Sequence, residues 1–178
     1  MALNGLPTYT PADGGIRNMT TDDLEAVLAI ERSSYVTPWS REMFRSELFS
    51  DICVNRVILR ENEVVGYSCF ALVVDEVHLR NITVRREWRH RGVATVLLHD
   101  MIRTALEQGA VFATLEVRPS NMEAVELYHH FGFSVTGVRP GYYGDTGEDA
   151  LIMWADIGNS DYGWLGREAD YYGTDAKT

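Results

Sequence analysis

A short cationic segment in the middle of the chain has the residue types that bind an anion. It reads Arg89-His90-Arg91-Gly92-Val93-Ala94 and stands between a strand-like stretch and an amphipathic helical one. The first backbone N–H groups of a helix have no intrahelical partner and carry a partial positive charge, so they can hold a pyrophosphate. Gly92 lets the backbone approach an anion closely, and two arginines add positive charge. The segment predicts an anion site; a basic surface loop ahead of a core helix is the alternative.

This segment differs from two other phosphate-binding motifs. It lacks the Gly-Lys-Ser/Thr ending of a P-loop, and its single glycine does not make a dinucleotide-binding fingerprint. The expected ligand is therefore a different kind of phosphorylated molecule.

Two later residues have the chemistry of proton transfer. Glu116 alternates with Leu115 and Val117, so its carboxylate lies on the opposite face of a strand and can serve as a general base. Tyr128, one turn into a short helix, can donate the proton of its phenol. A solvent-facing strand glutamate and a tyrosine packed in the core are the alternatives for these two residues.

The rest of the chain must position these groups, and its hydrophobic periodicity predicts alternating helices and strands. Helices are expected after Thr20 or Thr21, after Ser40, from Val93 to Gly109 and after Ser120, where Glu123 completes a capping box. Strands are expected at residues 16–19, 54–59, 64–74, 76–84, 111–117, 133–138 and 150–156.

The length of 178 residues suits one domain, which we place at residues 16–157. Residues 1–15 are expected to be a flexible leader without a signal peptide, and residues 158–178 a flexible tail or a segment that docks on the domain or a neighbour. No apolar run approaches the roughly 20 residues of a membrane helix. The two cysteines, Cys53 and Cys69, are expected to be reduced thiols of a cytoplasmic protein.

The net charge of the chain limits the classes of molecule that it is expected to bind. The formal net charge is −10, from 26 acidic and 16 basic side chains. This balance argues against general binding of nucleic acid, which needs a basic face. It is compatible with a cationic protein or peptide, and equally with a charge that serves only solubility.

These motifs together resemble a known family. Arg89-x-x-Gly92-x-Ala94 matches the acetyl-CoA signature of the GNAT superfamily, Gln/Arg-x-x-Gly-x-Gly/Ala. Several further stretches resemble the N-terminal protein acetyltransferase branch of that superfamily. They are Leu115-Glu116-Val117-Arg118, Asn121, Ala124, Leu127-Tyr128, Gly132-Phe133, Gly141-Tyr142-Tyr143, Gly147-Glu148-Asp149-Ala150 and Met153. With Pro38-Trp39-Ser40 added, the chain resembles the bacterial RimI type, the ribosomal-protein-alanine N-acetyltransferases.

The resemblance implies an α/β fold of the α+β kind. Its central sheet is mixed, mostly antiparallel and twisted, with six to seven strands, splayed between the fourth and the fifth and flanked by about four helices. Acetyl-CoA is then the co-substrate. The residues implied to bind it are Ile82, Thr83, Val84, Arg89, His90, Arg91, Gly92, Val93, Ala94, Thr95 and Asn121. His90 departs from the arginine common at its position, which would soften phosphate binding.

The resemblance also assigns roles on the acceptor side. It implies Glu116 as general base and Tyr128 as the acid that protonates the leaving thiolate, with no covalent enzyme intermediate and no metal. The residues implied to flank the acceptor are Glu31, Tyr35, Trp39, Tyr142 and Tyr143, and Asp145 or Glu148 are further candidates for holding an amine or a basic second residue. Surface polar residues and core aromatics are the alternative for this group.

The expected reaction is acetyl transfer to the N-terminal α-amine of a protein, with a ribosomal protein that starts with alanine as one candidate. Two alternatives of the same chemistry are a small-molecule amine and a protein lysine. A third, from another class, is a non-catalytic sensor of acyl-CoA, which would need the phosphate turn but neither Glu116 nor Tyr128. Neither direct nucleic-acid binding nor a membrane is expected, and the oligomeric state stays open.

Overall fold

A computed structural model describes residues 15–159 of the chain, so the predicted leader and tail lie almost entirely outside the described residues. The elements follow in this order: β1 (Ile16–Asn18), a 3-10 turn (Thr21–Asp23), α1 (Leu24–Ser34), α2 (Arg41–Leu48), β2 (Cys53–Arg60), β3 (Glu63–Val73), β4 (Glu76–Val84), a 3-10 turn (Arg86–Trp88), α3 (Val93–Glu107), β5 (Phe112–Val117), α4 (Met122–His130), β6 (Ser134–Tyr143) and β7 (Glu148–Asp156). None of the helices in this part of the chain is long and apolar enough to cross a membrane.

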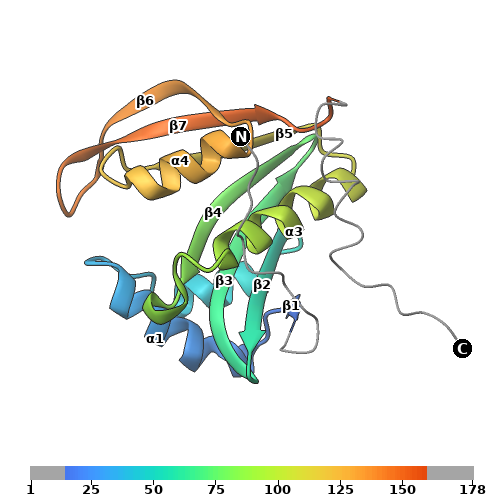
Figure 1. Cartoon of the computed structure of the whole chain (residues 1–178), viewed down its shortest axis with the longest axis vertical. Coiled ribbons are helices and arrows are strands. Elements are labelled where there is room, and N and C mark those ends of the chain that lie inside the picture. Colours follow the sequence, from blue (N-terminus) through green and yellow to red (C-terminus); the bar gives the residue numbers. More distant parts are fainter. Residues whose placement is uncertain (1–14, 160–178) are drawn as a thin grey trace, which may run out of the picture.

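The strands form one seven-stranded sheet in the order β1-β2-β3-β4-β5-β7-β6. Every neighbouring pair is antiparallel except β4 and β5, which run parallel because α3 crosses over between them. Helices cover both faces, with α1 and α2 on one and α3 and α4 on the other (Figure 1). This mixed, mostly antiparallel sheet with four α-helices in the described residues confirms the predicted fold class.

The sheet opens between β4 and β5. Their pairing runs from Glu76 opposite Phe112 to Leu79 opposite Leu115 and stops there, although β4 continues to Val84. Figure 1 shows the two groups of strands meeting at one end and diverging toward the other. The predicted splay between the fourth and fifth strands is confirmed, and it leaves the last five residues of β4 without a partner strand on that side.

Apolar side chains on the two faces explain why the helices pack where they do. Leu24, Val27, Leu28 and Ile30 recur at helical spacing along α1 and are buried against β2 and β3. On the other face α3 buries Leu98, Met101, Ile102 and Ala105 against the strands around the splay. Each large apolar side chain removed from water in this way stabilises the fold by about 1.5–3 kcal/mol.

One predicted helix start is confirmed and another is wrong. The Ser40 side chain accepts a hydrogen bond from the Met43 N–H, as expected of the first residue before α2. The predicted capping box of Ser120 and Glu123 does not form, because Asn121 caps α4 by accepting from the Ala124 N–H. Ser120 instead donates its backbone N–H and its hydroxyl to Glu148. Glu148 comes 28 residues later, so local spacing did not reveal this contact.

Candidate active site

The unpaired end of β4 exposes backbone groups to the splay. Arg85 donates its N–H to Val65 in β3, so Ile82 and Val84, in the alternate register, direct their backbone groups to the opposite side. Thr83 has the register of Arg85 and turns its backbone toward β3. Of the three residues predicted to bind the cofactor here, Ile82 and Val84 direct their backbone to the splay, where their carbonyls also accept from Tyr35 and Arg89, and Thr83 directs its backbone to β3.

The turn before α3 has the shape of an anion cradle. His90 and Gly92 both have positive φ, 57° and 76°, which alternates the direction of successive backbone groups. The first hydrogen bond of the helix joins the Val96 N–H to the Gly92 carbonyl, so the N–H groups of residues 93–95 have no acceptor within α3. The predicted anion-binding segment is thus a left-handed turn that leads directly into a helix N-terminus.

The two arginines of this turn make different contacts. Arg89 points back into the protein, donating from Nε to the Val84 carbonyl at 3.1 Å and from Nη2 to the Ser34 hydroxyl at 3.0 Å. Arg91 lies over the ring of Trp88, 5.1 Å from its centroid. Arg89 therefore fixes the turn against β4 and α1, while the Arg91 guanidinium stays beside the exposed turn.

Glu116 lies on β5 beyond the last residue that pairs with β4. Leu115 and Val117 are buried on the α3 and α4 face, so the predicted alternation is confirmed and the carboxylate is on the other face. There it borders a hollow of about 220 Å³ that His78 and Thr114 also line. Its side chain is 31% exposed, so a solvent molecule or a substrate group can reach it.

Three tyrosines from distant parts of the chain meet beside the splay. The hydroxyl of Tyr35 lies 2.8 Å from the Thr83 hydroxyl and donates a longer contact of 3.4 Å to the Ile82 carbonyl. Burial raises the pKa of Tyr128 well above its ordinary value, and nearby Tyr35 and Tyr143 raise it further. Burial likewise raises the pKa of Tyr143 to about 12. All three phenols keep their protons at neutral pH, which is the state a general acid requires.

Glu31 is buried, and hydrogen-bond donors surround its carboxylate. Its Oε1 accepts from the Trp39 N–H at 2.8 Å, Oε2 accepts from the Tyr67 hydroxyl, and the Asn81 amide lies 3.4 Å from both oxygens. The exposed fraction of Glu31 is 1%. The structure thus places Glu31 beneath the loop of residues 35–39, where it holds the backbone that carries Tyr35 and Trp39.

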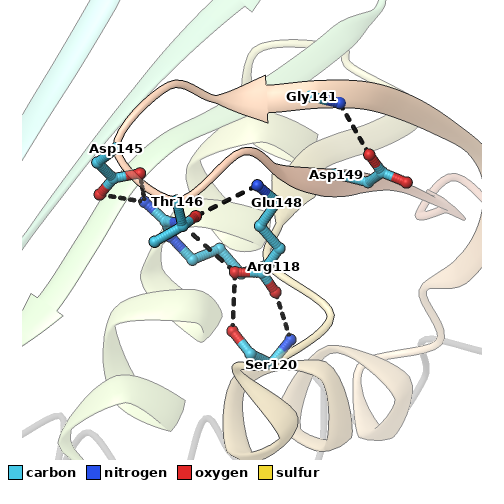
Figure 2. A network of polar contacts seen from close by, with 7 residues as sticks. All are labelled: Arg118, Ser120, Gly141, Asp145, Thr146, Glu148 and Asp149. Carbon is cyan, nitrogen blue, oxygen red and sulfur yellow. Dashed lines mark hydrogen bonds and ion pairs between the residues drawn. The ribbon is translucent and has the colours of Figure 1, made fainter.

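Arg118, which the sequence did not single out for a role, organises the far side of the site. It donates from Nη2 to both oxygens of Asp145 at 2.8 and 2.9 Å and from Nη1 to the Thr146 hydroxyl at 2.8 Å, as Figure 2 shows. Its guanidinium also covers the Tyr143 ring, 3.8 Å from the centroid. Arg118 thereby ties the turn between β6 and β7 to the end of β5.

The acidic residues of this turn serve the same network. The Glu148 carboxylate accepts from the Ser120 N–H at 2.8 Å and from the Ser120 hydroxyl at 3.0 Å. Asp149 accepts from the N–H of Gly141, whose φ of 59° bends β6 just before the two adjacent tyrosines (Figure 2). Asp145 and Glu148, candidates for holding an amine, thus have partners within the protein.

The network has a defined dependence on pH. The Arg118 hydrogen bonds lower the pKa of Asp145, and the Ser120 N–H and hydroxyl lower that of Glu148. A carboxylate whose pKa is lowered by folding stabilises the fold above its unfolded pKa and loses that contribution as the pH falls through the folded value. The turn is therefore expected to loosen only on the acid side of the ordinary carboxyl range, by an amount that solvent screening keeps small.

Arg118→Met is expected to loosen this turn without unfolding the domain. Amides of residues 141–148 should exchange with solvent about tenfold faster, because the turn loses the charged contacts that hold it to β5. Native-state hydrogen exchange followed by mass spectrometry measures this, with Arg85→Met, which removes the Arg85–Glu63 ion pair of another strand pair, as the matched control. Unchanged exchange in residues 141–148 would show that the turn holds its place without Arg118.

Comparison with known proteins agrees with this geometry. Residues 24–133 match the Acetyltransferase (GNAT) family. The ribosomal protein bS18-alanine N-acetyltransferase of Escherichia coli (strain K12) is 32% identical over 140 residues, covering 78% of this chain and 94% of that protein. An N-alpha-acetyltransferase of Saccharolobus solfataricus is 30% identical over 154 residues, covering 79% of this chain and 92% of the relative.

A solved structure extends the likeness to three dimensions. The crystal structure of the ribosomal-protein-S18-alanine N-acetyltransferase from Escherichia coli superposes with a TM-score of 0.76 and 28% sequence identity, covering 93% of this chain and 99% of that one. The splayed sheet, the left-handed turn before α3 and these matches give the same result. The chain belongs to the GNAT acetyltransferase family and is an N-acetyltransferase whose relatives include the RimI-type enzymes.

Proposed function

We propose that the enzyme transfers the acetyl group of acetyl-CoA to the N-terminal α-amine of a protein. The observation that carries the proposal is the pair of proton-transfer groups at the splay. Glu116 presents a reachable carboxylate from β5, and Tyr128 is a protonated phenol close to Tyr35, which touches the unpaired end of β4. The relatives named for acetylation of a ribosomal protein alanine support this acceptor and suggest a ribosomal protein, and hence a cytoplasmic reaction.

The splay and the turn before α3 suit acetyl-CoA, the co-substrate of GNAT enzymes. The pyrophosphate would lie against the free N–H groups of residues 93–95 and the turn that contains Gly92, with positive charge from Arg91. The amide-containing pantetheine arm would pair with the backbone groups of Ile82 and Val84. Asn121 uses its Oδ1 to cap α4, so its side-chain nitrogen is the part that would face the arm.

The expected reaction is a direct transfer. Glu116, directly or through a water molecule, removes a proton from the α-ammonium group, and the amine nitrogen forms a bond to the thioester carbonyl carbon. Backbone N–H groups of β4 near Ile82 and Val84 steady the oxyanion that forms. The carbon–sulfur bond then breaks, the departing thiolate takes the proton of Tyr128, and the nitrogen gives its second proton to the Tyr128 phenolate, directly or through solvent. The products are an N-terminal acetamide and free CoA, and the enzyme regains its protonation state through solvent.

The pKa of the acceptor favours an α-amine over a lysine. An α-amino group has an ordinary pKa of about 7.7–8.0 and a lysine side chain about 10.4. The difference of roughly 2.5 units makes deprotonation of lysine about 3.4 kcal/mol more costly at the same pH. Removing the proton of a lysine would therefore demand more of the same base than removing that of an α-amine.

Two groups of aromatic residues are assigned to the acceptor side. Tyr35 and Trp39 lie on the loop that Glu31 holds, and Tyr142 and Tyr143 lie on β6, their rings 5.1 Å apart at 88°. Tyr142 is 48% exposed and Tyr35 40%, so both rings are accessible to a peptide. We assign these four aromatics to the walls of the peptide path and Glu31 to the support of one wall.

A peptide panel tests this function. Peptides that differ in their first two residues, including peptides that begin with Ala, Ser or Met, are incubated with the enzyme and acetyl-CoA. Mass spectrometry then detects the added acetyl group. N-terminally blocked peptides with free lysines and a set of small amines accompany them. Acetylation of one or a few α-amine starts is the expected result. Transfer only to blocked peptides would assign the enzyme to lysine acetylation, and transfer only to small amines would assign it to that class.

A further inference from the structure

The carboxylate proposed as general base already has a cationic partner. Arg139, on β6, places Nη2 3.2 Å from Oε1 of Glu116. The two residues come from strands that are not neighbours, because β7 lies between β5 and β6. The contact therefore spans the width of a strand, and it covers the carboxylate from the acceptor side, where Tyr142 also lies.

Other basic side chains near Glu116 have acidic partners of their own. The hollow beside it is also lined by His78 and Arg80. His78 lies 2.7 Å from Glu76, and Arg80 lies 3.1 Å from Glu47. Among the residues that the structure describes, the ion pair that Glu116 makes is the one with Arg139.

We propose that Arg139 is a displaceable counterion that holds the place of the substrate's α-ammonium group on Glu116. Both groups are cationic N–H donors to the same carboxylate, and two cations held close together at one carboxylate repel each other. The arriving α-ammonium group, when it contacts Glu116 directly, is therefore expected to displace Arg139 from the carboxylate. This inference rests on the proposed α-amine function and deepens it, because it assigns a residue to acceptor binding rather than to the chemical step.

The surroundings of Arg139 allow the displacement. Its side chain is 56% exposed, so the guanidinium can move into solvent. The ring of Tyr142 lies 5.7 Å from it and offers a second favourable position through a cation–π contact. The strand also bends just after Arg139, where the pairing of β6 with β7 shifts register before Tyr143.

Removing the Arg139 guanidinium should lower the KM for the peptide modestly and leave the other kinetic constants unchanged. An exposed ion pair is worth up to about 1 kcal/mol, which corresponds to about a fivefold change in affinity. Arg139→Met is therefore expected to lower the KM for an α-amino peptide about two- to fivefold. The kcat should stay the same, because Arg139 has left Glu116 before proton transfer. The KM for acetyl-CoA should also stay the same.

Two further variants make the test specific. Arg139→Lys keeps a cation on the same strand and should retain a KM near that of the parent enzyme. Arg103→Met is the matched control, because Arg103 is similarly exposed, at 58%, and pairs with Asp100 at 2.9 Å on α3. Its kinetic constants should equal those of the parent.

Steady-state kinetics at saturating acetyl-CoA, with a peptide that the parent enzyme acetylates on its α-amine, separates the outcomes. A lower peptide KM in Arg139→Met alone supports the displaceable counterion. An unchanged or raised KM, or the same change in Arg139→Lys, would overturn it, since Arg139 would then build the site or contribute only its shape. A parent enzyme that acetylates no α-amine would overturn the proposed function itself, a separate result.

Discussion

Glu116→Gln is expected to lower kcat about 100- to 10,000-fold, the range that a positioned general base contributes. Glutamine keeps the size of the side chain but cannot accept the proton of the α-ammonium group. Leu115 and Val117, which pack into the core on the opposite face of β5, are unchanged, so the fold should be retained. Acetyl-CoA affinity, measured by calorimetry, should stay within about twofold, because the pyrophosphate turn lies on another element.

The pH dependence of this variant gives a second readout. The α-amine loses its own proton near pH 7.7–8.0, so the deficit of Glu116→Gln should shrink as the pH rises through that range. Glu63→Gln is the matched control, since Glu63 also pairs with an arginine, Arg85 at 2.7 Å, on a strand away from the site. A kcat equal to that of the parent at neutral pH would contradict the assignment of Glu116 as base.

Tyr128→Phe is expected to lower kcat about 100-fold, because the leaving thiolate loses its proton donor. The ring, whose centroid lies 5.9 Å from that of Phe133, is retained, so the packing of α4 should change little. The measurement is the rate of free CoA release between pH 6 and 9, compared with the thermal midpoint of the same variant.

Tyr143→Phe is the comparison that makes this result specific. Tyr143 lies close enough to Tyr128 to raise its pKa, and its own hydroxyl also holds its proton at neutral pH. If Tyr128→Phe turns over at the parent rate while Tyr143→Phe is slow, the acid is Tyr143. If both variants are slow, the two measurements separate them. The tyrosine whose loss slows CoA release without changing the peptide KM is the proton donor.

Much of the fold could be predicted because its determinants are local. The switch from a period of two to 3.6 after Gly92 predicted α3, and β4 was predicted with the bounds that the structure has, Glu76–Val84. The splay and the strand order had no local determinant in the sequence. The splay followed from the family resemblance of the motifs, which the structure and the comparisons confirm, and the strand order was not predicted.

The site was predictable to the extent that its residues lie in local motifs. Alternation along β5 predicted the face of Glu116, and the spacing of the basic turn predicted an anion cradle at the start of α3. The contacts of Arg118 with Asp145 and of Arg139 with Glu116 join residues 27 and 23 positions apart through the register of β5, β7 and β6. No local pattern encodes that register, because each strand fits the alternation equally well after a shift of two residues.

The error at the start of α4 has the same origin. Ser120 and Glu123 have the spacing of a capping box. The turn between β6 and β7, however, places Glu148 where it accepts the hydrogen bonds of Ser120 instead. Glu31 is a similar case. The family resemblance implied a residue that flanks the acceptor, and in the structure Tyr67, Asn81 and the loop that contains Trp39 enclose its carboxylate. In both cases partners that are distant in sequence make the contacts of the side chain.

The enzyme is proposed to transfer the acetyl group to an α-amine. This transfer is tested most directly with one peptide that starts with alanine, contains internal lysines and is incubated with the enzyme and acetyl-CoA. Tandem mass spectrometry then locates the acetyl group on the fragment ions. The expected result is a single acetyl group on the first residue, with the lysines unmodified even at high conversion. Acetyl groups on the lysines, with the α-amine left free, would contradict it.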